Sequence, residues 1–484
     1  MLKPMGQFTI SKQQSQEFAA LSGDYNPLHV DEVYSRRLQF GQPVIHGMHH
    51  LLRTWDEAYL DLPCPENAYL TQLNATFPNP VSINQPIEYS YQITPDHLGV
   101  VLKAYNKKRQ AILSLSLQFS SLPEALVDSP VLESQPPIET PINQTFPPKH
   151  SSGECQLYLD ASLAKKSFPR LFKHLPPYLL AQLLACTRVV GMKCPGLNSI
   201  FSRIKLDFNA DIAVANKGSL YYFEAHKDER FSILKLGVEG QGMKGSLDTF
   251  FRPTPVAQPS YLEVRSKVAD NMFAAQRALV IGGSRGVGEI TAKILAAGGA
   301  DVIITYNKGQ EEADKVATEI TQANARCRAQ TIDVTSSNEQ PLIQFEGKLL
   351  PTHIYYFASP HISANNTKDW DNELFIKFCR FYLDAFYKIV KCYAAEAKKS
   401  SSLITFFYPS TIFIDQPEKG FSEYAVAKGA GEALCKQLTT VHHEFKFIAP
   451  RLPRMQTDQT ASIIPIKCDL ASDVMLDELR NIDR

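Results

Sequence analysis

An aspartate and a histidine that lie close together in the sequence form the first group of residues able to do chemistry. Residues 21–29 read LSGDYNPLH, so Asp24 and His29 are five residues apart with Asn26 between them. Asp, Asn and Pro all favour turns, and a plain turn is the simplest interpretation of this run. A helix-like stretch at 46–60 follows and begins near Gly47. A carboxylate and an imidazole this close together could also act in acid–base chemistry.

A tyrosine and a lysine form the second group. Tyr424 and Lys428 are four residues apart in a helix-like stretch. Both side chains would lie on one helix face, where the ammonium can lower the pKa of the phenol. Isolated pairs with this spacing are common by chance. Fourteen residues before Tyr424, Ser410 and Thr411 follow a buried strand and offer two neighbouring hydroxyls, of which Ser410 is the first candidate and Thr411 the alternative.

A glycine-rich turn at 281–288, reading IGGSRGVG, lies between a short buried strand and a helix-like stretch. In this context it predicts a dinucleotide site, since the glycines let a pyrophosphate approach the helix N-terminus. The second strand ends in TYNK at 305–308, without an acid for a ribose 2′-hydroxyl. Two cations could instead meet a 2′-phosphate, although each alone could equally be a solvated surface residue. The predicted cofactor is therefore NADP(H), held by Gly282, Ser284, Arg285, Gly286, Gly288 and Lys308.

Two proline-rich segments, 121–149 and 253–260, read as linkers and divide the chain into blocks at 1–120, 150–252 and 261–484. Blocks one and two each combine a long apolar helix with alternating strand-like runs, and they look like a diverged internal repeat. This pattern predicts an α+β double hot-dog, in which a curled sheet wraps a central helix and the two copies pair. In block three, helix and strand patterns alternate, which predicts an α/β Rossmann-type, doubly wound parallel sheet.

The run around Asp24 resembles the MaoC-like (R)-specific enoyl hydratases of the hot-dog superfamily. The resemblance covers about residues 8–120 and includes TFPNPV at 76–81. It implies that Asp24 and His29 hold a water molecule, one as the base and the other orienting it. It further implies that Asn26 fixes the loop and that the Gly47 N–H receives the thioester carbonyl. The second block has no counterpart of the loop, so a non-catalytic partner that completes an acyl tunnel is expected there.

The histidines at 46, 49 and 50 could suggest a metal site. No carboxylate or cysteine is near them in the sequence, and the family that the chain resembles needs no metal. No metal site is therefore predicted.

The third block resembles the short-chain dehydrogenase/reductase family in its glycine spacing and in YAVAK at 424–428. The resemblance implies that Tyr424 donates a proton, that Lys428 activates it and binds the nicotinamide ribose, and that Ser410 holds the substrate carbonyl. Further cofactor contacts implied by it are Asp333 and Val334 at the adenine and Thr457 at the carboxamide. Two motifs depart from the family: an Asn-Asn-Ala-Gly run appears here as YFAS at 356–359, and the position of a relay asparagine looks like Tyr382.

Composition excludes other classes of protein. Fifty basic residues balance fifty acidic ones in the 484-residue chain, so no excess charge favours nucleic acid. Nine cysteines without a C-x-x-C pair favour free thiols in a reducing compartment. The N-terminus does not resemble a signal peptide, and the most apolar stretch is too short to span a bilayer. A cytoplasmic protein that binds neither nucleic acid nor membrane is expected.

Together, the two resemblances predict a bifunctional enzyme: an NADPH-dependent 3-oxoacyl thioester reductase and a 3-hydroxyacyl thioester dehydratase. Its substrates would be acyl-CoA or acyl-carrier-protein thioesters in fatty-acid or polyketide-type metabolism. One alternative is an active hydratase that carries an inert NADP(H)-binding module. Another is a non-catalytic acyl-binding scaffold of a synthase complex. A homodimer is implied only by the resemblance to the reductase family.

Overall fold

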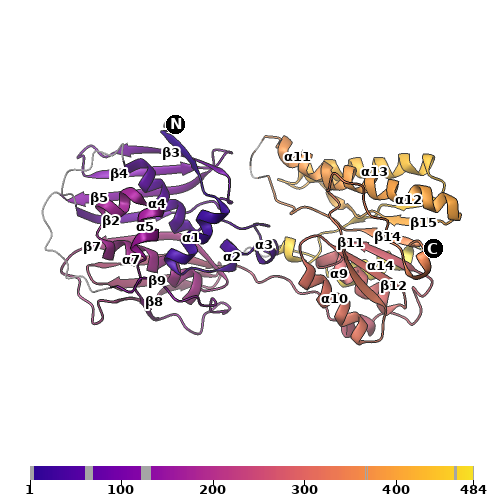
Figure 1. Ribbon diagram of the computed structural model, residues 1–484, viewed down its shortest axis with the longest axis horizontal. Helices are drawn as coiled ribbons and strands as arrows, with labels where there is room; N and C mark the ends of the chain where they lie inside the picture. Colours follow the sequence, from indigo (N-terminus) through magenta and orange to yellow (C-terminus); the bar gives the residue numbers. More distant parts are fainter. Residues whose placement is uncertain are drawn as a thin grey trace. The chain divides into compact units, whose positions relative to one another are not determined.

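The chain folds into two compact units. The computed structural model describes residues 5–59, 69–120, 132–365, 367, 369–462 and 466–482. Unit 1 is Met1–Thr254 with Ser462–Ile464, and unit 2 is Pro255–Ala461 with Pro465–Arg484. Figure 1 shows one antiparallel and one parallel sheet as their frameworks. No helix in the described ranges combines the length and apolar character that crossing a bilayer demands.

Unit 1 contains two copies of one arrangement of helix and strands. The first half comprises β1 Gly6–Thr9, α1 Lys12–Ser22, α2 Pro27–Val30, α3 Glu32–Ser35, α4 Gly47–Ala58, β2 Tyr69–Thr76, β3 Pro86–Ile93, β4 Gly99–Tyr105 and β5 Ala111–Ser120. The second half comprises β6 Gly153–Gln156, α5 Ala161–Ser167, α6 Pro169–His174, α7 Pro177–Arg188, the π-helix η2 Val189–Lys193, β7 Ser199–Phe208, β8 Ser219–Asp228, β9 Ile233–Gly240 and β10 Met243–Phe251.

The ten strands form one sheet in the order β1-β3-β4-β5-β2-β7-β10-β9-β8-β6. Each half contributes five strands, and the order of the second half mirrors that of the first. The halves join where β2 pairs antiparallel with β7, with Leu73 opposite Leu206. This symmetric order confirms the predicted double hot-dog fold, and the β2–β7 pairing removes an open sheet edge from each half.

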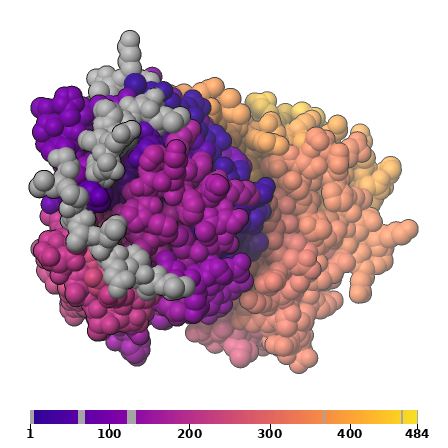
Figure 2. Space-filling view, turned by 60° about the vertical axis from the view of Figure 1, so that its left-hand side comes forward, coloured from indigo at the N-terminus to yellow at the C-terminus, as the bar shows by residue number. Residues whose placement is uncertain are grey.

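The central helices are buried because of the spacing of their apolar residues. In α4, Met48, Leu51, Leu52 and Trp55 recur at helical intervals and are fully buried in the core. Helix α7 is buried almost all round, as expected of a helix inside a curled sheet. Helices of the two halves also contact one another: α5 packs on α1, and α6 and α7 pack on α4. Figure 2 shows this magenta helical region of the second half on one face of the unit.

The described part of the first proline-rich segment is attached to the second half of unit 1. Residues 121–131 lie outside the described residues. In the remainder, the N–H of Ile142 donates to Met192 and its carbonyl accepts from Leu197, while Glu133 bridges to Tyr158. Residues 132–149 are therefore an extended strap along the second half of the unit.

Unit 2 is a doubly wound parallel sheet, which confirms the predicted fold class. Its strand order is β13-β12-β11-β14-β15-β17. The strands are β11 Arg277–Ile281, β12 Asp301–Tyr306, β13 Cys327–Thr331, β14 His353–Tyr356, β15 Ile404–Phe407 and β17 Phe445–Ile448. A separate parallel pair joins β16 Ser410–Thr411 to β18 Arg451–Leu452.

Helices cover both faces of this sheet (Figure 1). One face packs on α8 Tyr261–Arg265, α9 Gly286–Ala297, α10 Gln310–Gln322 and α14 Ala471–Asn481. The other packs on α11 Asn372–Cys379, the π-helix η4 Arg380–Ala385, α12 Phe386–Ser400 and α13 Ser422–Val441. Three short 3-10 turns complete the unit: η3 Glu346–Lys348, η5 Ile412–Ile414 and η6 Asp458–Thr460. The carboxyl ends of β11, β12 and β13 meet at one edge, which is where a doubly wound sheet binds its ligand.

Candidate active sites

The loop after α1 buries Asp24. Helix α1 ends at Gly23, whose φ of 74° reverses the chain, and Asn26 then caps α2 by accepting from the N–H of Leu28 at 3.1 Å. The Nδ2 of Asn26 donates to the carbonyl oxygens of Gly191 at 3.0 Å and Gly196 at 3.1 Å. Asn26 therefore fixes the loop by binding the second half of unit 1.

The carboxylate of Asp24 has a hydrogen-bond donor on each oxygen. Its Oδ1 accepts from the Asn26 N–H at 3.2 Å, and its Oδ2 accepts from the Thr187 hydroxyl at 2.7 Å. Burial raises the pKa of Asp24, while the neighbouring His29 and the Thr187 hydrogen bond oppose that rise. A Cβ on Gly191 would lie 2.1 Å from Oδ1, so only glycine allows this approach. Both Thr187 and Gly191 belong to the second half of the unit.

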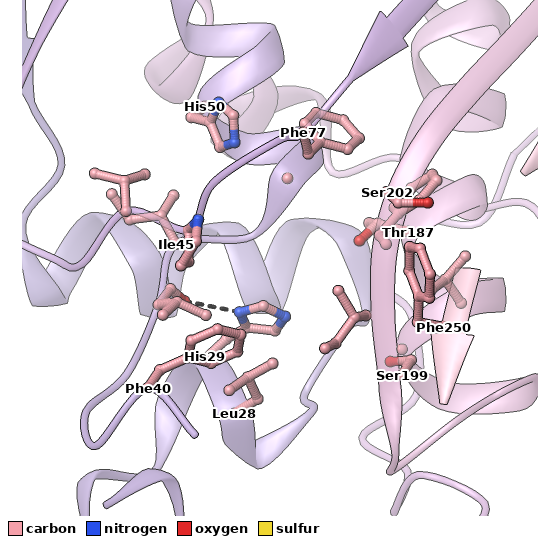
Figure 3. A pocket seen from close by; sticks show the side chains of 18 of the residues that line it. Leu28, His29, Phe40, Ile45, His50, Phe77, Thr187, Ser199, Ser202 and Phe250 are labelled. Atoms are coloured by element: carbon pink, nitrogen blue, oxygen red, sulfur yellow. Dashed lines mark hydrogen bonds between the residues drawn. The ribbon is translucent and has the colours of Figure 1, made fainter. Parts of the chain in front are cut away.

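His29 is oriented by the backbone. Its Nδ1 donates to the carbonyl oxygen of Val44 at 2.7 Å, which fixes the tautomer that leaves Nε2 as an acceptor (Figure 3). Its ring stacks on His46 with centroids 3.8 Å apart. Burial, and then the neighbouring His46, lower the pKa of His29 to about 3. The imidazole is thus neutral at ordinary pH and able to accept a proton.

His46 lies beside a carboxylate, so the expectation that the histidine cluster lacks one is wrong. Its Nε2 donates to the backbone carbonyl of Asp24 at 3.0 Å, and atoms of Asp24, His29 and His46 suited to metal binding lie within 4.8 Å of one another. The turn at 23–26 folds the loop back over the start of α4 and brings these groups together. Acid–base chemistry without a metal stays a prediction for this group of residues.

A cavity of about 260 Å³ lies beside this pair (Figure 3). Asp24 and His29 reach it from the loop, and Gly47 reaches it from the first turn of α4. The N–H groups of a first helical turn have no partner within their own helix, and they favour a negative oxygen. Lining residues from both halves are mostly apolar: Leu28, Phe40, Val44, Ile45, Phe77, Val81, Val190, Ile200, Phe201 and Phe250.

Sequence reasoning missed the cavity residues of the second half. Thr187, Gly191 and Ser199 line the cavity with Phe201 and Phe250. None of them belongs to a recognisable motif, and Thr187 lies in a helix that reads as uniformly apolar. The sequence predicted only that this half, which lacks a loop like 21–29, would complete an acyl tunnel without a catalytic role. The structure places its side chains on the cavity wall and identifies the residues that form it.

In unit 2, the glycine-rich turn forms a tight cradle between β11 and α9. Gly282 has a φ of 82°, and a Cβ on Gly288 would lie 2.2 Å from the Gly282 carbonyl oxygen. Gly286 begins the helix with a φ of 57°, and the Thr457 side chain lies 3.7 Å from the place of its missing Cβ. Ser284 is buried in the turn. This bare backbone at a helix N-terminus fits a dinucleotide pyrophosphate.

The other predicted cofactor residues surround the same edge of the sheet. Arg285, next to the cradle, forms an ion pair with Asp458 at 3.6 Å. Lys308 is exposed just beyond the end of β12. After β13, Asp333 accepts from the Thr335 N–H at 2.9 Å, which shapes the turn, and Val334 is buried. The structure therefore brings Thr457 to the cradle and leaves Arg285 engaged with a carboxylate.

Tyr424 and Lys428 lie on one face of α13, as their spacing predicts. Burial raises the pKa of Tyr424 to about 12, although a hydrogen bond with Thr411 counteracts this rise. Burial lowers the pKa of Lys428 to about 7. The ammonium donates to the Pro409 carbonyl at 2.6 Å and lies 4.0 Å from the centre of the Tyr382 ring.

The two adjacent hydroxyls of β16 have different partners. Ser410 donates to the Glu432 carboxylate at 2.5 Å, and Arg451 binds the same carboxylate at 2.9 Å and 2.7 Å. The Thr411 side chain instead lies beside the Tyr424 hydroxyl, close enough to lower its pKa. The structure therefore brings Thr411, and not Ser410, together with the tyrosine. Successive side chains of a strand point to opposite faces, which explains this division.

The ring of Tyr382 packs against the ammonium of Lys428. It lies in the π-helix η4, is buried, and shares a hydrogen bond of 2.7 Å with the Ser359 hydroxyl. The two departures from the family pattern, Ser359 and Tyr382, are thus in direct contact. An aromatic ring stands where the family pattern places a relay amide.

Comparisons with known proteins agree with the folds of unit 1 and unit 2. Residues 3–108 match the family described as MaoC like domain, and residues 276–450 match the short chain dehydrogenase family. An (R)-specific enoyl-CoA hydratase of Aeromonas caviae is 35% identical over 79 residues, which are 16% of this chain and 57% of that protein. An NADP(+)-dependent L-rhamnose 1-dehydrogenase of Thermoplasma acidophilum is 32% identical over 119 residues, which are 25% of this chain and 43% of that protein.

A shorter match joins the chain to a fatty acid synthase beta subunit of Emericella nidulans, 53% identical over 36 residues, which are 7% of this chain and 2% of that protein. The chain thus spans less than two thirds of each of these relatives. The family matches, with the two folds, confirm both resemblances. The chain carries a MaoC-like dehydratase domain and, further along, a short-chain dehydrogenase domain.

Proposed function

We propose that the protein reduces a 3-oxoacyl thioester with NADPH and then removes water from the 3-hydroxyacyl product. The observation that carries this proposal is the pair Asp24 and His29 facing an apolar cavity at the start of α4. The enoyl-CoA hydratase and the fatty acid synthase subunit among the relatives support thioesters as the substrate class. The reductase and dehydratase act on consecutive intermediates, which explains why both domains occur in one chain.

The dehydratase step is a proton transfer coupled to loss of a hydroxyl. A base takes the proton on C2, and the C3 hydroxyl leaves with a proton as water, so that a C2–C3 double bond forms. In the reverse direction, water held by Asp24 and His29 adds to C3. The neutral Nε2 of His29 can accept the proton of this water, while N–H groups near Gly47 stabilise the charge on the thioester oxygen.

The reductase step places a proton on the substrate oxygen. When bound, NADPH supplies the hydride to C3. Tyr424 donates its phenolic proton, and the Thr411 hydroxyl lies next to it. Lys428, one turn further along the same helix, would hold the nicotinamide ribose. The fit of the cradle at Gly282 and Gly288 supports a dinucleotide. The absence of an acid in the TYNK run and the NADP(+)-dependent relative support NADP(H).

A second candidate function is a hydratase whose short-chain dehydrogenase domain binds NADP(H) without turnover. The contact of Lys428 with Pro409 and with the Tyr382 ring favours it, because both hold the ammonium inside the protein. Assays with a short 3-oxoacyl thioester, as CoA and as carrier-protein forms, separate the two. NADPH oxidation that is lost in Tyr424→Phe, with a product one water lighter than the hydroxyacyl thioester, supports the bifunctional enzyme. NADPH binding without oxidation, with hydration of an enoyl thioester intact, supports the second candidate.

A further inference from the structure

The hydroxyl of Thr187 points across the interface between the two halves of unit 1. A threonine inside a helix commonly hydrogen-bonds the carbonyl four residues earlier. Thr187, near the end of α7, instead donates to Oδ2 of Asp24 at 2.7 Å, across 163 positions of sequence. Its side chain is buried and lines the cavity (Figure 3). The hydrogen bond thus links the second half directly to the candidate catalytic carboxylate.

Several other contacts fix the end of α7 relative to the loop at 23–26. The chain leaves α7 through the π-helix η2, in which Gly191 presents its carbonyl to Asn26 and its bare Cα to Asp24. A π-helical turn inside an α-helix often marks a functional site. Because Asn26 also donates to Gly196, the loop at 23–26 is fixed to the second half at more than one point. The position of Thr187 relative to Asp24 is therefore well determined.

We propose that Thr187 is a positioning residue for the hydration and dehydration reaction: its hydroxyl fixes the Asp24 carboxylate, in its ionised form, beside His29. This inference rests on the proposed hydratase function. It assigns a functional role to the half of unit 1 that lacks a catalytic loop. That half supplies one of the two donors to the carboxylate, and the Asn26 N–H supplies the other.

The charges around Asp24 make this hydrogen bond important. His29 on α2, His46 at the start of α4 and Arg188 on α7 are the titratable groups that face the carboxylate. Burial lowers the pKa of the two imidazoles to about 3 and about 4, so both are neutral near neutral pH. Arg188 is engaged with the Cys155 sulfur and the Gln156 carbonyl. Loss of the Thr187 hydroxyl would therefore raise the pKa of Asp24 further.

The test compares Thr187→Val with Thr187→Ser in the full chain, by following hydration of a short 2-enoyl thioester across the pH range. For Thr187→Val we expect a fall in kcat/KM of about 10- to 100-fold, the range for hydrogen bonds to charged groups. We also expect the acid limb of its pH profile to move up by about one unit, since ionised Asp24 becomes harder to form. Thr187→Ser should restore both quantities, because it keeps the hydroxyl.

The matched control is Thr249→Val. Thr249 is another buried threonine of the second half; it donates to the Leu234 carbonyl and lies away from the cavity. If Thr187→Val fails to fold, Thr187→Cys, with its weaker donor, should fall between Ser and Val in the same assay. An unmoved acid limb in Thr187→Val or Thr187→Cys, or equal losses in Thr187→Val and Thr249→Val, would overturn the inference. Absence of hydration by the unaltered protein would instead refute the proposed function.

Discussion

The two candidate sites bury ionisable groups in different ways. Around Asp24, both carboxylate oxygens have hydrogen-bond donors, and His29 is fixed by the Val44 carbonyl. Around Tyr424, the buried ammonium of Lys428 has a backbone carbonyl and two aromatic faces, and its pKa falls to about 7. At the first site, hydrogen bonds within the protein fix the ionisable groups. At the second site, the Lys428 ammonium has few polar partners to stabilise its charge. Such a cation gains from a polar ligand such as a cofactor ribose.

The largest effect should come from His29. Replacement by alanine removes the acceptor for the proton of water, and we expect hydration of an enoyl thioester to fall about 10³-fold, within the range of acid–base catalysis. NADPH oxidation by the same protein should be unchanged, because His29 belongs to unit 1 and the dinucleotide cradle with Tyr424 belongs to unit 2. His49→Gln is the control, since His49 is buried against Phe18 and away from the cavity. Equal losses in both variants would show a structural effect and remove His29 from the mechanism.

Tyr424→Phe tests the candidate reductase site in unit 2. It removes the proton donor, so NADPH-dependent reduction should fall about 10²-fold, measured as NADPH absorbance with a 3-oxoacyl thioester. Hydration should stay within twofold of the unaltered protein, as measured in parallel. Tyr387→Phe, at an exposed tyrosine of α12, should leave both activities intact. Full reduction by Tyr424→Phe would mean that the proton comes from elsewhere.

The two hydroxyls of β16 should differ in importance. Because Thr411 lies beside Tyr424 and lowers the pKa of its phenol, Thr411→Val should lower reductase kcat/KM about tenfold, the scale of one hydrogen bond. Ser410→Ala breaks a contact with Glu432 and should instead lower thermal stability with little effect on kcat/KM. Kinetics and a melting curve for each variant check this. The reverse order would restore Ser410 as the group that holds the substrate carbonyl.

The smallest effect concerns stability. The pKa of Lys428 is about 7 in the folded protein against an ordinary value of 10.5. Between these values the unfolded chain binds more protons, so this group lowers stability as the pH falls from 10.5 to 7. Lys428→Met, without cofactor, should therefore melt about 2–4 °C higher near neutral pH, with the gain shrinking as the pH rises. Lys436→Met, at an exposed residue of the same helix, should show no such trend; a gain independent of pH would contradict the explanation.

Local spacing in the sequence was enough to predict the groups that lie within one turn or one helix. Asp24, Asn26 and His29 belong to a single loop, and Tyr424 and Lys428 to one helix face, so their proximity follows from the backbone. The strand-like runs of blocks one and two were also visible as alternation, since each strand of the ten-stranded sheet has one face on the core.

What the sequence could not supply depends on pairing between distant segments. The β2–β7 pairing and the packing of α7 on α4 bring Thr187 to Asp24, and no motif marks that threonine. Ser410 and Thr411 are adjacent in β16 and point to opposite faces of the strand. Which of them lies beside Tyr424 depends on the orientation of the strand, which the sequence does not give. His46 and Asp24 are 22 positions apart in the sequence, and the turn at 23–26 brings them together.

The mirror order of the ten strands has a consequence for how this chain could diverge. In a dimer of identical subunits, every substitution appears at both equivalent positions. Here the two copies are covalently one chain, so a change at Thr187 leaves its counterpart in the first half untouched. The two copies can therefore differ: the first carries the loop with Asp24 and His29, and the second places Thr187 against that loop. Joining the two halves in one chain thus allows the two related surfaces to differ in sequence, which a dimer of identical subunits does not allow.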